Sequence, residues 1–229
     1  MLLSDPELEA LSLSLAIALR SVVVSLPFAI LIAWLLTRKR FVGRVMLDAF
    51  VHLPLVLPPV VVGYLLLVML GTRGPIGGWL DRTLGIQLIF TRNGAAIATA
   101  VMAFPLMVRA IRISLENVDP GLEEAARTLG AGPLDRFCTI TLPLMLPGIL
   151  AGAITAFAAG LGEFGAVITF VSNIPGETRT LPLALYTAIQ TPGGDAIAAR
   201  LAAISFSLGL AGLLLSEGLS RAIRMRLGR

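Results

Sequence analysis

Long apolar runs alternate with short polar segments along this chain, and their lengths are typical of helices that cross a membrane. A span needs about 20 apolar residues to cross roughly 30 Å of bilayer hydrocarbon. Four stretches meet this requirement, at residues 11–37, 45–70, 142–171 and 196–219, and a fifth candidate, 94–113, has a shorter apolar run and carries Pro105. The pattern therefore predicts an all-α polytopic membrane protein, with five transmembrane helices in a single domain over residues 1–229.

Prolines interrupt the second of these stretches. Pro54, Pro58 and Pro59 lie within it, and a proline lacks the backbone N–H of a regular helix and clashes with the preceding turn. We expect a kink or a break at this point, which a bilayer tolerates where protein or a cavity surrounds the backbone.

A shorter apolar piece lies in the predicted loop 172–195. It is the segment 181–189, which follows Thr180 and is too short to cross a bilayer. We expect one capped helix there, which lies flat on the outer side or re-enters the membrane.

The polar loop at residues 114–141 contains helix boundary signals. Asp119 followed by Pro120 is typical of an N-cap and a first helical residue, and Gly130 is placed to end this helix in a left-handed conformation. A second short helix is expected after it, until Pro143 opens the next membrane segment. The loop is therefore predicted to form a helix-turn-helix at the membrane surface.

The basic residues are distributed unevenly over the chain. Three segments hold most of them: Arg38, Lys39, Arg40 and Arg44; Arg109, Arg112, Arg127 and Arg136; and Arg221, Arg224, Arg226 and Arg229. The loops 71–93 and 172–195 hold only four arginines, and the N-terminal segment is acidic. Because cytoplasmic loops retain positive charge, we expect a periplasmic N-terminus, periplasmic loops at 71–93 and 172–195, and a cytoplasmic C-terminus.

The composition excludes several classes of protein. Hydrophobic residues make up 56% of the chain and charged residues 14%, which is more apolar surface than one soluble core can bury. The formal net charge of +4 comes from loop residues without interleaved aromatics. It therefore favours contact with anionic membrane lipids over nucleic acid.

Enzymatic motifs are missing from the sequence. It contains no G-x-x-x-x-G-K-[ST] phosphate loop, and neither a G-x-S-x-G nor an H-E-x-x-H arrangement. His52 and Cys138 are the only histidine and cysteine, which excludes an internal disulfide. We therefore expect neither an enzyme nor a resident metal or cofactor.

The loop 114–141 also carries a spaced motif. Three residues separate its first part from Gly130, and nine separate Gly130 from its last part. The motif residues are Glu124, Ala125, Ala126, Gly130, Ile140, Leu142 and Pro143. This pattern resembles the EAA signature loop of the permease subunits of ATP-binding-cassette (ABC) importers, in their type I or MetI-like class. The alternative is a plain capped linker, because Glu-Ala-Ala is common in helices.

The resemblance implies a fold, partners and a source of energy. In that family the EAA loop docks into a cleft of a separate ATPase subunit, which implies that Glu124, Ala125, Ala126 and Gly130 make this contact here. It also implies two ATPase copies that use ATP and Mg²⁺, a homodimer of this chain around a central path, and a periplasmic substrate-binding protein.

Three further segments look like the permeases of molybdate importers. They are residues 52–63, 162–166 and 172–180. Sulfate and thiosulfate permeases are similar around 163–165 and remain the alternative within the class, while tungstate is expected to share the route of molybdate. An uncoupled membrane channel or scaffold is the alternative outside it. The resemblance implies a multi-pass protein of the bacterial inner membrane.

Charges inside apolar runs are costly and mark candidate functional residues. Glu163, Arg20 and Arg200 are expected at a similar depth near the outer interface. Glu163 is therefore predicted to pair with one of the two arginines and to fix the outer gate region. The alternative is that each charged side chain extends into water.

Thr178, Arg179 and Thr180 form a candidate contact on the outer side. Docking of the periplasmic binding protein, which the resemblance implies, is the favoured role. The alternative is contact with the released oxyanion, because guanidinium and hydroxyl donors suit its oxygens.

Small residues recur every four positions along the fourth stretch, at Gly148, Gly152, Ala156 and Gly160. In lipid, such stripes let two helices approach closely. They predict close packing either within the chain or against a second copy.

Overall fold

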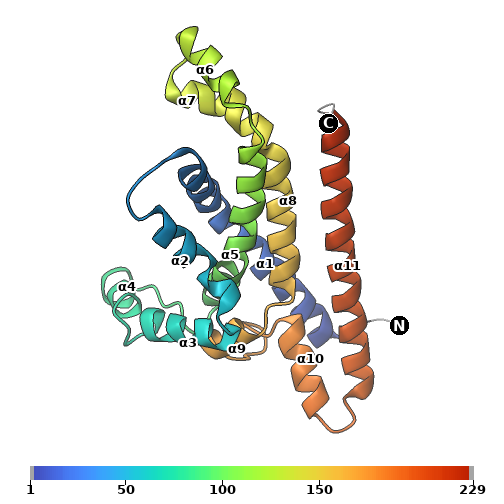
Figure 1. Ribbon diagram of the computed structural model, residues 1–229. Coiled ribbons are helices and arrows are strands. Elements are labelled where there is room, and N and C mark those ends of the chain that lie inside the picture. Colours follow the sequence, from blue (N-terminus) through green and yellow to red (C-terminus); the bar gives the residue numbers. More distant parts are fainter. Residues whose placement is uncertain (1–2, 227–229) are drawn as a thin grey trace.

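The chain folds entirely into helices over the part that the structure describes, residues 3–226 (Figure 1). In this computed structural model the elements are α1 (Asp5–Arg38), α2 (Arg44–Val56), α3 (Pro59–Leu70), α4 (Gly77–Leu84), α5 (Arg92–Glu116), α6 (Pro120–Thr128), α7 (Pro133–Arg136), a π-helical turn (Phe137–Thr141), α8 (Leu142–Leu161), α9 (Gly165–Val171), α10 (Leu181–Gln190) and α11 (Asp195–Arg226). Within these described residues, four helical stretches are long and apolar enough to cross a membrane, and a fifth span results if the bent pair of α2 and α3 counts as one. The predicted all-α membrane fold is confirmed.

The second predicted span is broken. The axes of α2 and α3 differ by 116°, and the break falls where Pro58 and Pro59 begin the second piece. Leu57, the last residue before them, has extended backbone angles, as expected for a residue that precedes a proline. The expected break is confirmed, and 45–70 is two half-helices.

The fourth predicted span, 142–171, is wrong as a single helix. The helix α8 ends at Leu161, and α9 begins at Gly165 after a short irregular segment. The Glu163 carboxylate accepts a hydrogen bond from the backbone N–H of Ala166 at 2.9 Å. This side chain therefore satisfies a free amide at the start of α9.

The half-helices α3 and α9 pack closely against each other. A Cβ atom placed on Gly63 would lie 2.7 Å from the carbonyl oxygen of Ala166, and one placed on Gly165 would lie 2.7 Å from Cβ of Pro59. Only glycine fits at both contacts. The two breaks in the predicted spans thus meet each other in the fold.

The centre of the molecule is a seam between α5 and α8, covered on one side by α1. Buried side chains on α5 (Met107, Ile111 and Leu115) pack against Met145 on α8. The small-residue stripe of α8 lies in this seam, because a Cβ atom on Gly148 would collide with Ser114, and one on Gly160 would lie 2.7 Å from Cγ2 of Thr99. Close packing within the chain is therefore confirmed for the stripe.

The helix α11 lies along one side of the body and is joined to it by α10 (Figure 1). A Cβ atom on Gly212 would lie 3.0 Å from Cβ of Ala158 on α8, whereas one on Gly209 would meet nothing within 4 Å. The predicted helix at 181–189 is present as α10, and its N-terminal amide on Leu181 donates to Oγ of Ser14 at 2.7 Å.

The predicted cytoplasmic tail contains the last arginines of the chain. Arg229 lies outside the described residues, and the side chains of Arg221, Arg224 and Arg226 lie outside the described part of α11. The orientation of the termini stays a prediction.

Candidate functional site

The helices α6 and α7 project from one end of the molecule, beyond α5 and α8 (Figure 1). The first residues of α6 follow the sequence prediction, because the Asp119 carboxylate accepts a hydrogen bond from the N–H of Gly121 at 2.8 Å and Pro120 is the first helical residue. No residue of α6 is buried. This helix is therefore capped and positioned at its start without being part of the apolar core.

The end of α6 has the predicted left-handed glycine. Gly130 has a φ of +88°, and its N–H donates to the carbonyl of Arg127 at 3.1 Å. The next N–H, on Ala131, donates to the carbonyl of Ala126 at 3.0 Å. These two bonds form a Schellman motif, which glycine favours because it adopts positive φ without strain.

Two neighbouring glutamates on α6 have different surroundings. The side chain of Glu123 accepts a hydrogen bond from Oγ1 of Thr141 at 2.8 Å and lies 3.2 Å from Nη2 of Arg38. Glu124, the glutamate of the motif, is exposed. Consecutive helical residues are about 100° apart around the axis, so one carboxylate binds to the body of the protein and the other is free for a partner.

The exposed surface of the projecting helices is partly apolar. Leu122, Leu129 and Leu134 are 46%, 88% and 80% exposed, and they accompany the exposed motif residues Glu124, Ala125 and Gly130, while Ala126 is half-buried. Large exposed leucines on a polar loop are typical of an interaction surface. We name this surface, residues 122–134, the coupling surface, after the role that the sequence resemblance implies; its leucines are not part of the sequence motif.

The second half of the motif belongs to a continuous helix. The predicted second short helix is present as α7. It is continuous with the next membrane segment, because a π-helical turn joins it to α8 in one helical stretch from Pro133 to Leu161. In this turn the N–H of Leu142 donates to the carbonyl of Phe137, and Thr141 is buried. The remaining motif residues therefore lie where the coupling surface joins α8. Ile140 and Leu142 are half-buried, and Pro143 is exposed in the first turn of α8.

The predicted ion pair of Glu163 with Arg20 or Arg200 is not formed. Nε of Arg200 lies 2.9 Å from the carboxylate of Glu7, a buried side chain near the start of α1. Nη1 of Arg20 donates to Oδ1 of Asn93 at 3.4 Å. Glu163 instead caps α9, because backbone amides at a helix start are closer to it than either guanidinium.

The predicted outer contact at residues 178–180 is mostly internal. Thr178 and Thr180 are buried, and Oγ1 of Thr178 accepts from the N–H of Ile174 at 2.9 Å and donates to the carbonyl of Ser172 at 3.0 Å. Both threonine side chains are therefore covered in this structure, and a docking or oxyanion role for them stays a prediction. Arg179 is half-buried and donates through Nε to Oδ1 of Asn173 at 3.0 Å, so its role stays a prediction.

A second polar cluster joins α2 to α5. The Arg112 guanidinium binds both oxygens of Asp48, at 3.1 and 3.2 Å, and it also contacts Glu116 at 2.9 Å. Nδ1 of His52 lies 3.2 Å from the Asp48 carboxylate. This cluster lies outside the residues predicted from the sequence, although Asp48 is a charge inside a predicted span, which is the signal for such a cluster.

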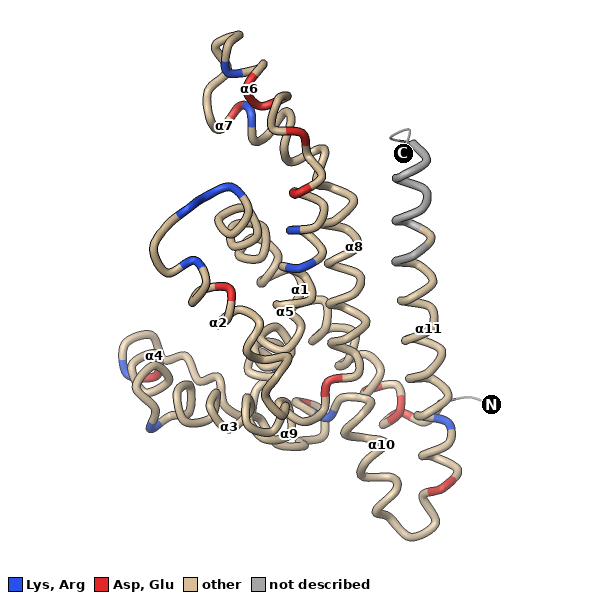
Figure 2. The backbone as a smooth tube through the Cα atoms, in the orientation of Figure 1, with Lys and Arg blue, Asp and Glu red and all other residues tan. Residues whose placement is uncertain are grey.

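The charged residues lie mostly away from the middle of the long helices (Figure 2). They gather on α6 and α7, in the loop between α1 and α2, and around the opposite end of the body, while α8 carries none. Among the described residues, no group of histidine, cysteine, aspartate and glutamate is arranged to hold a metal ion.

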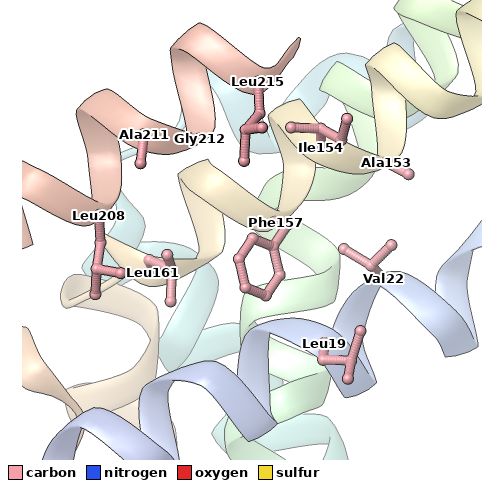
Figure 3. Close-up of a pocket in the computed structure, with 10 residues that line it drawn as sticks. All are labelled: Leu19, Val22, Ala153, Ile154, Phe157, Leu161, Leu208, Ala211, Gly212 and Leu215. Atoms are coloured by element: carbon pink, nitrogen blue, oxygen red, sulfur yellow. The ribbon is translucent and has the colours of Figure 1, made fainter. Parts of the chain in front are cut away.

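An apolar groove lies between α1, α8 and α11 (Figure 3). Its volume is about 410 Å³. It is lined by Leu19, Val22, Ala153, Ile154, Phe157, Leu161, Leu208, Ala211, Gly212 and Leu215. None of these side chains can donate a hydrogen bond to an oxyanion, so the groove is not a binding site for one.

The fold is similar to that of known transport proteins. The chain superimposes on a subunit of a bacterial ABC transporter involved in the import of the acidic polysaccharide alginate, with a TM-score of 0.76, 20% identity, and coverage of 96% of this chain and 81% of that chain. The fold is therefore that of the membrane subunits of ABC importers.

Similarity in sequence is much higher to several curated relatives. The chain is 61% identical over 229 residues to the molybdenum transport system permease protein ModB of Escherichia coli K12, covering 100% of both chains. It is 56% identical over 223 residues to ModB of Haemophilus influenzae, covering 97% of each. The sulfate transport system permease protein CysT of E. coli K12 is 40% identical over 184 residues, which cover 79% of this chain and 66% of CysT.

The sequence also matches the model of a protein family. The model for their inner membrane component matches residues 25–225. This chain belongs to the family of binding-protein-dependent transport system inner membrane components.

Proposed function

We propose that this chain is the permease subunit of an ATP-driven importer that carries molybdate, and also tungstate, across the inner membrane. The observation that carries the proposal is that the similarity to molybdenum permeases extends over the whole chain. The sulfate permease matches a smaller part of the chain and of its own length. A sulfate or thiosulfate importer is therefore the weaker second candidate.

Energy would come from a separate ATPase subunit that binds the coupling surface. Supporting this, Glu124, Ala125 and Gly130 are exposed at the tip of a projecting helix pair, and exposed Leu129 adds apolar area to the contact. The chain would form a homodimer with two ATPase copies, which bind and hydrolyse ATP with Mg²⁺. The coupling surface and the C-terminus would then face the cytoplasm, and the N-terminus the periplasm.

Substrate would arrive from the other end. A periplasmic molybdate-binding protein would dock where α10 and the loop with Arg179 lie, on the side opposite the coupling surface (Figure 1). Closure of the two ATPases would move both coupling surfaces, and the membrane path would open alternately to the outside and the inside. The broken spans at α2–α3 and α8–α9 provide the joints for such a movement, because their half-helices are not rigid continuations of each other.

The test is ATPase activity of the chain reconstituted in lipid with its ATPase subunit. Binding protein is added empty, or loaded with molybdate, tungstate or sulfate. The proposal predicts stimulation by loaded protein, with molybdate and tungstate preferred over sulfate. A preference for sulfate would move the chain to the second candidate. Absence of both a stable complex and stimulation would leave an uncoupled channel or scaffold.

A further inference from the structure

Three segments that are distant in sequence meet at one carboxylate below the coupling surface. Arg38 is the last residue of α1, Glu123 is in the first turns of α6, and Thr141 is in the π-helical turn that leads into α8. Glu123 binds the other two side chains, at 3.2 Å from Nη2 of Arg38 and 2.8 Å from Oγ1 of Thr141. We name these three residues the polar bracket.

The bracket is partly shielded from solvent. The side chains of Arg38 and Glu123 are 18% and 26% exposed, and Thr141 is 2% exposed. The same Nη2 atom of Arg38 also donates to the carbonyl of Val118 at 3.2 Å, in the linker before α6. Hydrogen bonds between charged partners strengthen as water is excluded, so these contacts are stronger than a typical surface ion pair.

The position of α6 depends on these contacts because apolar packing does not hold it. No α6 residue is buried, whereas α1 and α8 both contribute to the central core. Without the bracket, α6 would be connected to the body by its two chain ends and could rotate on them. With the bracket, a displacement of α6 is transmitted to α1 and α8 together.

We propose that Glu123 is the positioning residue that couples α6 to the membrane helices during transport. Glu124 contacts the ATPase, and Glu123 transfers the resulting movement to α1 and α8. This inference rests on the proposed function, because it requires an ATPase that moves the coupling surface. It assigns different roles to two adjacent glutamates that a sequence motif alone would treat together.

The test compares Glu123→Gln with Glu124→Gln in the reconstituted complex with molybdate-binding protein. Both remove one negative charge from the same helix turn. For Glu123→Gln we expect normal assembly with the ATPase and an about fivefold to tenfold fall in molybdate transported per ATP hydrolysed, at the lower end of coupling between sites. For Glu124→Gln we expect weaker assembly. The double variant Arg38→Glu with Glu123→Arg restores an ion pair of reversed polarity, and it should recover at least half of the wild-type ratio of molybdate transported to ATP hydrolysed.

A second variant covers the case in which Glu123→Gln fails to accumulate. Thr141→Val keeps the shape and removes one donor, and the ratio should fall about twofold to threefold, because one of the two contacts remains. An unchanged ratio in Glu123→Gln, or in Thr141→Val where only that variant folds, would overturn the inference. So would loss of assembly by Glu123→Gln equal to that of Glu124→Gln. A wild-type complex that loaded binding protein does not stimulate would overturn the proposed function itself.

Discussion

The seam between α5 and α8 and the projecting helix α6 are stabilised in opposite ways. In the seam, glycines such as Gly148 bring the backbones so close that a single added methyl group would collide. On α6, no residue is buried, and polar contacts from Glu123 fix its place. This difference separates substitutions that act on the stability of the fold from substitutions that act on binding of a partner. Substitutions in the seam should reduce stability, and substitutions on α6 should leave stability intact and alter assembly or coupling.

The largest effect is expected in the seam. Gly148→Val places side-chain atoms where Ser114 already lies, and overpacking of this size costs about 3 kcal/mol. The thermal unfolding midpoint in detergent should fall strongly and little protein should accumulate in the membrane. Gly209→Val is the matched control, because a Cβ there meets nothing within 4 Å. Equal unfolding midpoints for Gly148→Val and Gly209→Val would contradict the assignment of close packing to the seam.

A buried ion pair within the body should give the next largest effect. Arg200→Leu leaves the Glu7 carboxylate, 3% exposed, without its cation. We expect a loss of about 2 kcal/mol, below the usual cost for a fully buried pair because the Arg200 side chain is 32% exposed. The control is Arg92→Leu, whose pair with Glu177 is about half exposed at 3.6 Å. Denaturation in mixed micelles should rank Arg200→Leu as clearly more damaging than Arg92→Leu.

Substitutions on the coupling surface should change the affinity of the chain for the ATPase subunit. Leu129→Ala should leave the unfolding midpoint unchanged, since Leu129 is 88% exposed, and should weaken binding of the ATPase about tenfold, as for an apolar interface anchor. Leu84→Ala, on α4 at the opposite end and 59% exposed, should change neither. Binding measured by titration in detergent tests this. A stability loss in Leu129→Ala without weaker binding would contradict the assignment of this surface.

The smallest effect concerns the end of α6. Gly130→Ala forces a Cβ into positive φ at +88°, which costs about 1 kcal/mol locally. Gly132→Ala should cost almost nothing, because Gly132 has a φ of −68° and open space around it. Hydrogen exchange of the α6 amides should become faster in Gly130→Ala alone. Faster exchange in both variants would show that the left-handed turn is not the cause.

The features that could be predicted from the sequence are those set by neighbouring residues, both in the fold and in the coupling surface. The break at Pro58, the cap at Asp119 and the left-handed turn at Gly130 each depend on residues within a few positions of the feature. Steric and hydrogen-bonding limits act at that range, so they can be recognised in sequence. The apolar runs likewise located the helices that are long enough to span a membrane.

The failures arise where a partner lies far away in sequence, or where a break in a helix or the burial of a loop decides the contact. Glu7 and Arg200 are 193 positions apart, and Glu7 precedes the predicted first span, so the pairing of Arg200 could not be read from depth alone. Glu163 was assigned to a cation because its nearest alternative, the free amides of α9, existed only if the fourth span was broken. Thr178 and Thr180 looked available because a polar loop carries no sign of its own burial.

Direct contact between the coupling surface and the ATPase tests the account most closely. Leu129→Cys in a Cys138→Ser background provides a single thiol on α6, and Leu84→Cys in the same background provides one on α4. A short thiol-to-amine crosslinker is added to the assembled complex in lipid. The account predicts a crosslinked product with the ATPase subunit from position 129 and none from position 84. No product from position 129, or equal products from both, would contradict it.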